Sequence, residues 1–302
     1  MPLHSRALAA AFLVVAAGCS RASTTTTTSP SPAAHDHPAG GVQVTVSVDD
    51  DPSIAPGNVM AMARLQRSPR HGEWVTIRTD AQAGDSVRAY VVYPQRSTKA
   101  PVVVVVHEIF GLSTWIRSVA DQLAADGFIA IAPDFLTGKI PQSATDTVGM
   151  QTAMAAIRTL DPEVVQRQID AAAAYGMALP AAAPRYGVVG FCWGGGVSFA
   201  HAVHSPNLGA SVVYYGTSPA SASLASVRAP VLGLYGENDA RVDATIPPAD
   251  SAMRALGKSF TYQIFPGAGH GFLRAQDQAA NRAAAQRAWP MTVQFFRQNL
   301  ER

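Results

Sequence analysis

The chain of 302 residues contains few cysteines, few charges and no long apolar run. Its two cysteines, Cys19 and Cys192, allow at most one disulfide, which excludes a small fold held together by several disulfides. Charged residues form 15% of the chain, the formal net charge is +2, and no run of lysine or arginine stands out, so we expect no nucleic-acid partner. The apolar run from Ala7 to Ala17 is too short to span a membrane.

This apolar run instead predicts a signal peptide over residues 1–18. Arg6 precedes the run, and Val15-Ala-Ala-Gly-Cys19 resembles a bacterial lipobox, whose cysteine is lipidated and becomes the first residue of the mature protein. The alternative is an ordinary secretory signal that is cleaved nearby. We therefore expect an exported protein of the bacterial cell envelope, with membrane contact through a lipid anchor on Cys19.

Three further segments follow the signal. Residues 19–41 are rich in Ser, Thr and Pro with almost nothing to bury, which predicts a disordered tether. His35 and His37 in this tether lack the fixed geometry of a metal site, and we expect neither a metal nor a cofactor. Residues 42–70 are expected to form an irregular N-terminal extension with one short helix, and residues 71–302 the folded domain.

The pattern of the last segment predicts an α/β fold. Residues 74–79 and 86–93 alternate apolar and polar side chains around a turn at Gly84, which indicates an antiparallel hairpin. The continuous run from Val102 to Val106 is typical of a parallel strand that is buried on both faces. Because strands and helices then alternate to the end of the chain, we expect a three-layer domain with a mostly parallel sheet.

The most informative stretch is Gly190-Phe-Cys-Trp-Gly194, which joins a short apolar strand to a helix. Small residues two positions before and after Cys192 are typical of a nucleophile elbow, a strained turn that needs neighbours without bulk. The N–H of Trp193 and the N-terminus of the helix would favour a thiolate. The alternative is a buried structural cysteine beside a tight turn.

Polar groups that could activate this thiol follow other predicted strands. A thiol needs a base, and an imidazole base needs an acceptor that fixes its tautomer. His270 stands in a glycine-rich loop after the last strand, and Asp239 follows the strand before it, with Asp243 as a rival acid. Cys192, Asp239 and His270 fall in the order nucleophile, acid, histidine that α/β-hydrolases use.

Four ordered motifs make a family resemblance specific: they are His107-Glu-Ile-Phe-Gly-Leu112, Gly190-Phe-Cys-Trp-Gly-Gly195, Gly236-Glu-Asn-Asp239 and Gly267-Ala-Gly-His-Gly-Phe272. Together they resemble the dienelactone hydrolase family (carboxymethylenebutenolidase-like enzymes) of the α/β-hydrolase fold. The resemblance implies a triad of Cys192, His270 and Asp239. It also implies that Glu108 holds the resting cysteine and helps to deprotonate it, and that the backbone N–H groups of Ile109 and Trp193 form an oxyanion hole.

The resemblance is less complete for substrate binding. It implies that Arg274, four residues after His270, binds a substrate carboxylate, which suits a guanidinium fork. The alternative is a solvated arginine. A second carboxylate-binding arginine of the family has no clear match, although the corresponding region contains Lys139 and Arg158. Aromatic candidates for lining the pocket are Phe135, Trp115 and Tyr215.

These residues predict a monomeric enzyme that cleaves a small ester or enol lactone through a thioester on Cys192. One alternative is a catalytically idle lipoprotein that keeps the hydrolase fold as a ligand-binding or envelope-interaction module, which a missing triad member would indicate. A second is redox chemistry at Cys192, which the absence of a resolving cysteine in the domain disfavours.

Overall fold

A computed structural model describes residues 50–79, 85–141 and 149–301 of the chain. The predicted signal peptide, the tether with His35 and His37, and Cys19 lie outside the described residues. The eight strands of the described part are β1 Gly72–Arg78, β2 Ser86–Val92, β3 Ala100–Val106, β4 Ile129–Asp134, β5 Ala182–Phe191, β6 Ala210–Tyr214, β7 Val231–Asn238 and β8 Phe260–Gly269.

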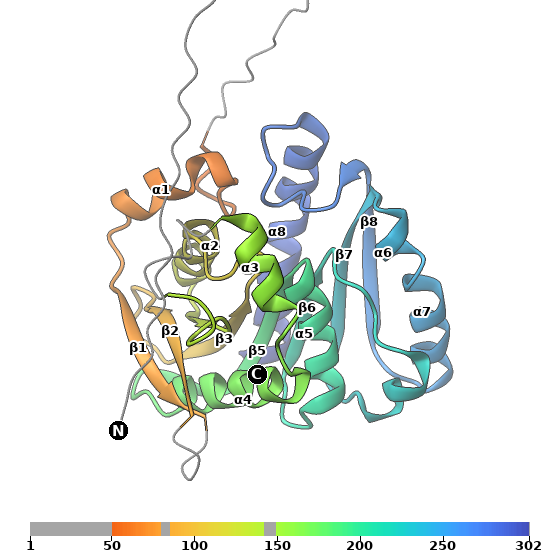
Figure 1. The fold of residues 1–302 in the computed structure, drawn as a ribbon, viewed down its shortest axis with the longest axis horizontal. Helices are drawn as coiled ribbons and strands as arrows, with labels where there is room; N and C mark the ends of the chain where they lie inside the picture. The colour runs from red at the N-terminus through yellow and green to blue at the C-terminus, as the bar shows by residue number, and fades with distance from the viewer. Residues whose placement is uncertain (1–49, 80–84, 142–148, 302) are drawn as a thin grey trace, which may run out of the picture. The chain divides into compact units, whose positions relative to one another are not determined.

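The strands form one sheet in the order β1-β2-β4-β3-β5-β6-β7-β8 (Figure 1). β2 pairs antiparallel with β1 and β4, and every other pairing in the sheet is parallel. The expected hairpin and the expected mostly parallel sheet are therefore both confirmed. β3 lies near the middle of the sheet, and all of its residues are buried, as its unbroken valine run predicts.

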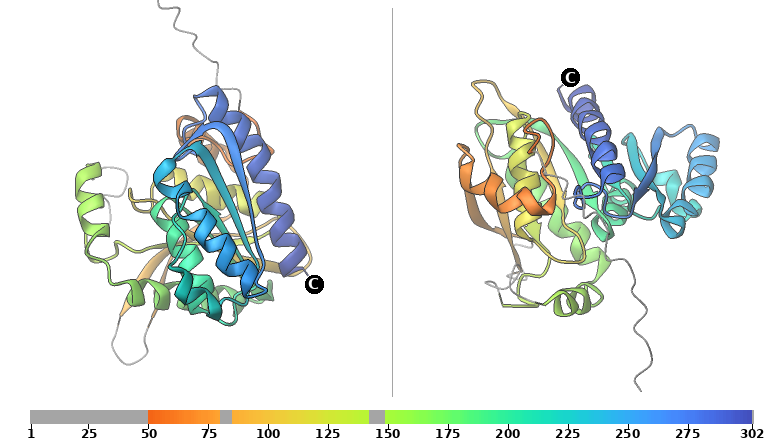
Figure 2. Two further views of the ribbon diagram at one scale, coloured as in Figure 1. Left: turned by 90° about the vertical axis from the view of Figure 1, so that its right-hand side faces the viewer. Right: turned by 90° about the horizontal axis from the view of Figure 1, so that it is seen from above.

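Helices cover both faces of this sheet (Figure 2). One hydrophobic cluster joins the sheet to α2 (Thr114–Ala125) and α8 (Ala279–Leu300), and the other joins it to α4 (Pro162–Met177), α5 (Trp193–His204) and α7 (Ile246–Ala255). Ser113 caps the N-terminus of α2, and Asp161 caps α4, through side-chain oxygens that accept backbone N–H groups. The helices are α1 Asn58–Arg67, α2 Thr114–Ala125, α3 Met150–Ile157, α4 Pro162–Met177, α5 Trp193–His204, α6 Ala240–Asp243, α7 Ile246–Ala255 and α8 Ala279–Leu300, with a 3-10 helix at Ser221–Ser226.

The described part of the N-terminal extension packs against the sheet-and-helix domain. Its helix α1 is the short helix that the sequence predicts, and α1 contacts α2. Ile54, Ala55 and Ala61 are at most 2% exposed and join the same hydrophobic cluster as α2 and α8. Residues 50–67 therefore share the core of the domain that follows them.

The topology gathers the candidate site at one edge of the sheet. Parallel strands end at the same edge, so the residues that follow them meet there. His107 follows β3, Cys192 follows β5, Asp239 follows β7 and His270 follows β8. This edge therefore holds each of the four motifs that the sequence singles out.

Candidate active site

Cys192 occupies a strained turn between the last residue of β5 and the first residue of α5. Its backbone has φ 57° and ψ −116°, a conformation that residues with a Cβ rarely adopt. A Cβ on Gly190 would lie 1.8 Å from the carbonyl oxygen of Gly194, and one on Gly194 would lie 2.4 Å from the carbonyl oxygen of Val106. The turn therefore requires glycine at both positions, as the elbow pattern predicts.

Two backbone amides face the Cys192 sulfur. They are the N–H groups of Ile109 and Trp193, and their hydrogen bonds to the sulfur lower the pKa of the thiol. Burial and the negative charge of Glu108 act in the opposite direction and raise this pKa to about 11. The helix N-terminus therefore does not by itself produce a thiolate, and the thiol is protonated at neutral pH.

Glu108 follows β3 and is a buried carboxyl group, with 3% of its surface exposed. Burial raises its pKa to about 7, and the positive charge of Arg274 lowers it. The Nε atom of Arg274 lies 3.3 Å from Glu108 Oε2, but neither atom has a hydrogen-bond partner among the described residues. The two groups therefore attract each other as charges without an aligned hydrogen bond.

His270 and Asp239 are joined directly. The Nδ1–H of His270 donates to Asp239 Oδ2 at 2.5 Å, which leaves Nε2 as the basic nitrogen. The imidazole packs edge-on against the ring of Tyr215, with 5.2 Å between the ring centroids. Asp243, the rival acid, has its pKa raised by burial and by the charge of Asp239. The hydrogen bond thus pairs His270 with Asp239.

His107 opens one of the four sequence motifs, but the sequence assigned it no role in the site. It is fully buried, and burial lowers its pKa to about 4, so the ring is neutral at physiological pH. Its Nδ1–H donates to the carbonyl oxygen of Glu108 at 2.7 Å, and its Nε2 accepts the N–H of Phe135 at 3.3 Å. The carbonyl of Glu108 and the N–H of Ile109 belong to one planar peptide unit, so His107 also orients that N–H.

The elbow opens into a cavity of about 740 Å³. Cys192 and His270 both line it, together with Ile109, Trp193 and Tyr215. The hydroxyl of Tyr215 is buried and has no hydrogen-bond partner among the described residues.

Three of the residues expected at the substrate pocket, Arg274, Phe135 and Trp115, are not among the residues that line this cavity. Phe135 is buried and packs against the rings of His107 and Trp193. Arg274 faces Glu108 instead. The charged side chains that do line the cavity are Arg158 and Arg241, and no carboxylate of the described residues joins them. Arg241 lies two residues after Asp239, a position that no sequence motif marks.

Residues 87–300 match the model of the "Dienelactone hydrolase family". The chain belongs to this family. The predicted resemblance and the predicted α/β-hydrolase fold are thereby confirmed, and the protein is a member of a hydrolase family.

Individual relatives agree with this assignment. A Salmonella typhimurium protein named "Putative carboxymethylenebutenolidase" is 33% identical over 229 residues, which cover 71% of this chain and 84% of that protein. A Bradyrhizobium protein named "Probable 2-oxo-3-(5-oxofuran-2-ylidene)propanoate lactonase" is 32% identical, over 76% of this chain and 94% of that protein. A crystal structure from Klebsiella pneumoniae, named as that of a "Putative Dienelactone Hydrolase", has a TM-score of 0.66 at 28% identity and covers 76% of this chain and 99% of its own.

The close backbone contacts at the elbow predict a severe effect of Gly190→Ala. The added methyl group overlaps the carbonyl of Gly194 and approaches the backbone nitrogen of Gly195, and these backbone atoms cannot turn aside as a flexible side chain could. We expect the free energy of unfolding to fall by at least about 3 kcal/mol, measured by urea denaturation. The control is Gly149→Ala, because a Cβ at Gly149 meets nothing within 4 Å and should cost less than about 1 kcal/mol. Equal stabilities of the two variants would contradict the tight elbow.

Proposed function

We propose that this protein hydrolyses a small ester or lactone, with Cys192 as the nucleophile. The observation that carries the proposal is that Cys192 and His270 line one cavity while Asp239 holds the His270 ring. A catalytically idle hydrolase fold would be indicated by a missing member of this set. Since all three residues are present and His270 is already oriented, the idle alternative is not favoured.

The first half of the proposed reaction transfers the acyl group to sulfur. Glu108, ionised above its pKa of about 7, draws the proton from the Cys192 thiol, and this proton passes to Nε2 of His270. The thiolate then attacks the ester carbonyl and forms a C–S bond. The N–H groups of Ile109 and Trp193 stabilise the oxyanion. When the ester C–O bond breaks, the imidazolium of His270 protonates the leaving oxygen.

The second half releases the acid. His270 Nε2 takes a proton from water, and the resulting hydroxide attacks the thioester carbonyl. The C–S bond breaks, the proton returns to sulfur and the carboxylic acid leaves the cavity. Asp239 stabilises the imidazolium in both halves through its hydrogen bond to Nδ1.

The cavity favours a substrate that carries an acidic group. Arg158 and Arg241 line it, and neither guanidinium has an ion-pair partner among the described residues. We propose that one or both bind a substrate carboxylate, because a guanidinium fork matches two carboxylate oxygens. The Bradyrhizobium relative is named for a lactone that carries a propanoate group, which supports this choice. Arg274, which the family resemblance implies for this role, would act on Glu108 instead.

The mechanism predicts how activity depends on pH. kcat/KM for para-nitrophenyl acetate should rise as pH increases through about 7, because Glu108 must be ionised to draw off the thiol proton. Cys192→Ala should lower the rate by at least about 1000-fold. Glu108→Gln should lower the rate and abolish the rise near pH 7, whereas Glu163→Gln, an exposed glutamate at the start of α4, should change neither. Equal rates for Cys192→Ala and the unmodified protein would refute the proposal.

The membrane attachment is a separate proposal, because Cys19 lies outside the described residues. Among the residues that the structure describes, no helix has the length and apolar character needed to cross a bilayer. We propose that a lipid on Cys19 anchors the exported protein. Cells grown with a clickable fatty acid should label the protein and lose the label with Cys19→Ala; an unlabelled protein, or label that survives the substitution, would contradict the anchor.

A further inference from the structure

We propose that Asn58, the first residue of α1, is a positioning residue that holds Arg274 beside Glu108. The proposal rests on the proposed function in one respect only, the catalytic role of Glu108. It concerns a residue that precedes the family match, which begins at residue 87.

Asn58 binds Arg274 in two ways. Its side-chain Oδ1 accepts a hydrogen bond from Arg274 Nη2 at 3.1 Å. Its backbone N–H donates to the carbonyl oxygen of Arg274 at 2.8 Å. The extension therefore fixes both the backbone and the guanidinium of a residue that follows His270 by four positions.

The guanidinium of Arg274 lies between Asn58 and Glu108. Its Nη2 is bonded to Asn58, its Nε lies 3.3 Å from Glu108 Oε2, and its central carbon lies 4.8 Å from the centre of the Phe110 ring. The Arg274 side chain is 33% exposed, so water also solvates its charge and weakens the attraction to Glu108. Without the Asn58 side chain, the described part of the chain offers this long and flexible side chain no hydrogen bond that keeps it turned toward Glu108.

The segment that carries Asn58 is itself held firmly. Gln276 donates to the carbonyl oxygen of Ala55, and the indole N–H of Trp115 donates to that of Pro56, each at 2.9 Å. A Cβ on Gly57 would lie 3.0 Å from Cβ of Gln276, so the segment and the loop after His270 are in close contact.

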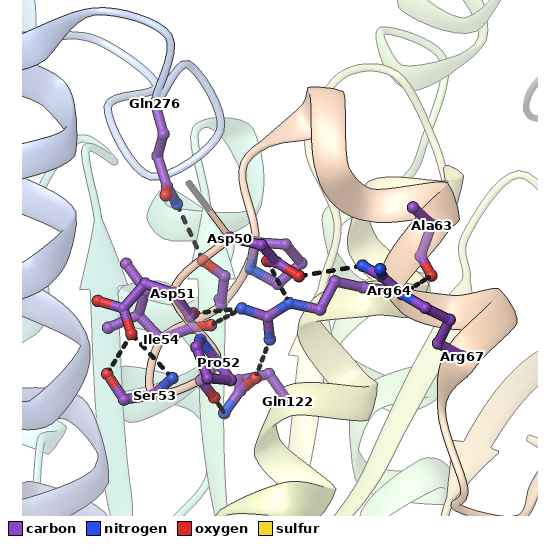
Figure 3. A network of polar contacts seen from close by, with 12 residues as sticks. Asp50, Asp51, Pro52, Ser53, Ile54, Ala63, Arg64, Arg67, Gln122 and Gln276 are labelled. Atoms are coloured by element: carbon purple, nitrogen blue, oxygen red, sulfur yellow. Dashed lines mark hydrogen bonds and ion pairs between the residues drawn. The ribbon is translucent and has the colours of Figure 1, made fainter. Parts of the chain in front are cut away.

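A second set of contacts anchors the other side of this segment (Figure 3). The guanidinium of Arg64 bonds to the Asp50 carboxylate, to Gln122 on α2 and to the backbone oxygens of Asp51 and Ile54. These contacts tie residues 50–54 to α1 and α2. The segment that carries Asn58 is therefore held in place where the Asn58 side chain bonds to Arg274.

The expected consequence is electrostatic. Arg274 is the cation that lowers the pKa of Glu108 against the effect of burial. The other titratable groups that face Glu108 are Cys192 and Tyr215, and burial keeps both neutral near pH 7. His107, which bonds to the Glu108 backbone, is neutral there as well. Releasing Arg274 therefore removes the one positive charge that favours ionised Glu108 and should raise its pKa.

A carboxyl titration tests this without relying on activity. The full-length protein is labelled with glutamate carrying 13C at the side-chain carboxyl, and the Glu108 signal among the five glutamates is identified by its loss in Glu108→Gln. Arg274→Ala should raise the midpoint of the Glu108 titration by about one pH unit or more, and Asn58→Ala by roughly half a unit or more. Val59→Ala is the matched control on α1, because Val59 is 66% exposed and should leave the midpoint unchanged.

Asn58→Ala isolates the side chain, since the exposed position keeps its backbone bond to Arg274. An unchanged Glu108 midpoint in Asn58→Ala would overturn the proposal, whether or not Arg274→Ala moves it. An equal upward shift in the pH at which kcat/KM rises would support the proposal further. Because the titration needs no substrate, a protein without esterase activity would refute the proposed function and still decide the role of Asn58.

Discussion

The close approach of the β5–α5 turn to the end of β3 is the constraint on which the site depends. Glycines at 190 and 194 permit it, and a methyl group at either position would overlap a backbone carbonyl. The approach holds Cys192 at positive φ and brings its sulfur within reach of the N–H groups of Ile109 and Trp193. The strain is balanced by the fully buried strands β3 and β6 on either side of β5, because a rigid support is what allows a disfavoured backbone to persist.

Around this turn, burial and charge act against each other. Burial disfavours both the thiolate of Cys192 and the carboxylate of Glu108. Two backbone amides favour the thiolate, but the pKa of Cys192 stays at about 11, whereas Arg274 favours the carboxylate of Glu108, whose pKa is about 7. A site of this kind keeps its thiol protonated at rest, and in the mechanism proposed here the thiolate forms when Glu108 draws off the proton.

The sequence allowed the fold and the centre of the site to be predicted because both follow from local patterns. The valine run of β3 indicates a strand buried on both faces, and the glycines around Cys192 indicate the elbow. Strand ends meet at one edge of a parallel sheet, so Asp239 and His270 could be placed near the thiol without coordinates. The family motif also favoured Asp239 over its rival Asp243, and the hydrogen bond between Asp239 and His270 agrees with that choice.

Other features depend on contacts between distant segments, which no local pattern encodes. The sequence shows only that His107 follows a strand, and its hydrogen bonds to the backbone of Glu108 and Phe135 could not be predicted from it. The orientation of Arg274 toward Glu108 depends on Asn58, 216 positions earlier in the chain. Arg241 could not be recognised as a cavity residue, because α6, a single turn, gives no periodic signal.

The most direct test of Cys192 as the nucleophile is to identify the residue that carries the acyl group. His270→Gln should acylate and then fail to activate water, so para-nitrophenyl acetate followed by an acid quench and peptide mass spectrometry should detect one acetyl group. The proposed mechanism places this group on the peptide that contains Cys192, as a thioester that hydroxylamine removes. An acetyl group on another residue, or equal labelling after the further substitution Cys192→Ala, would contradict a cysteine nucleophile.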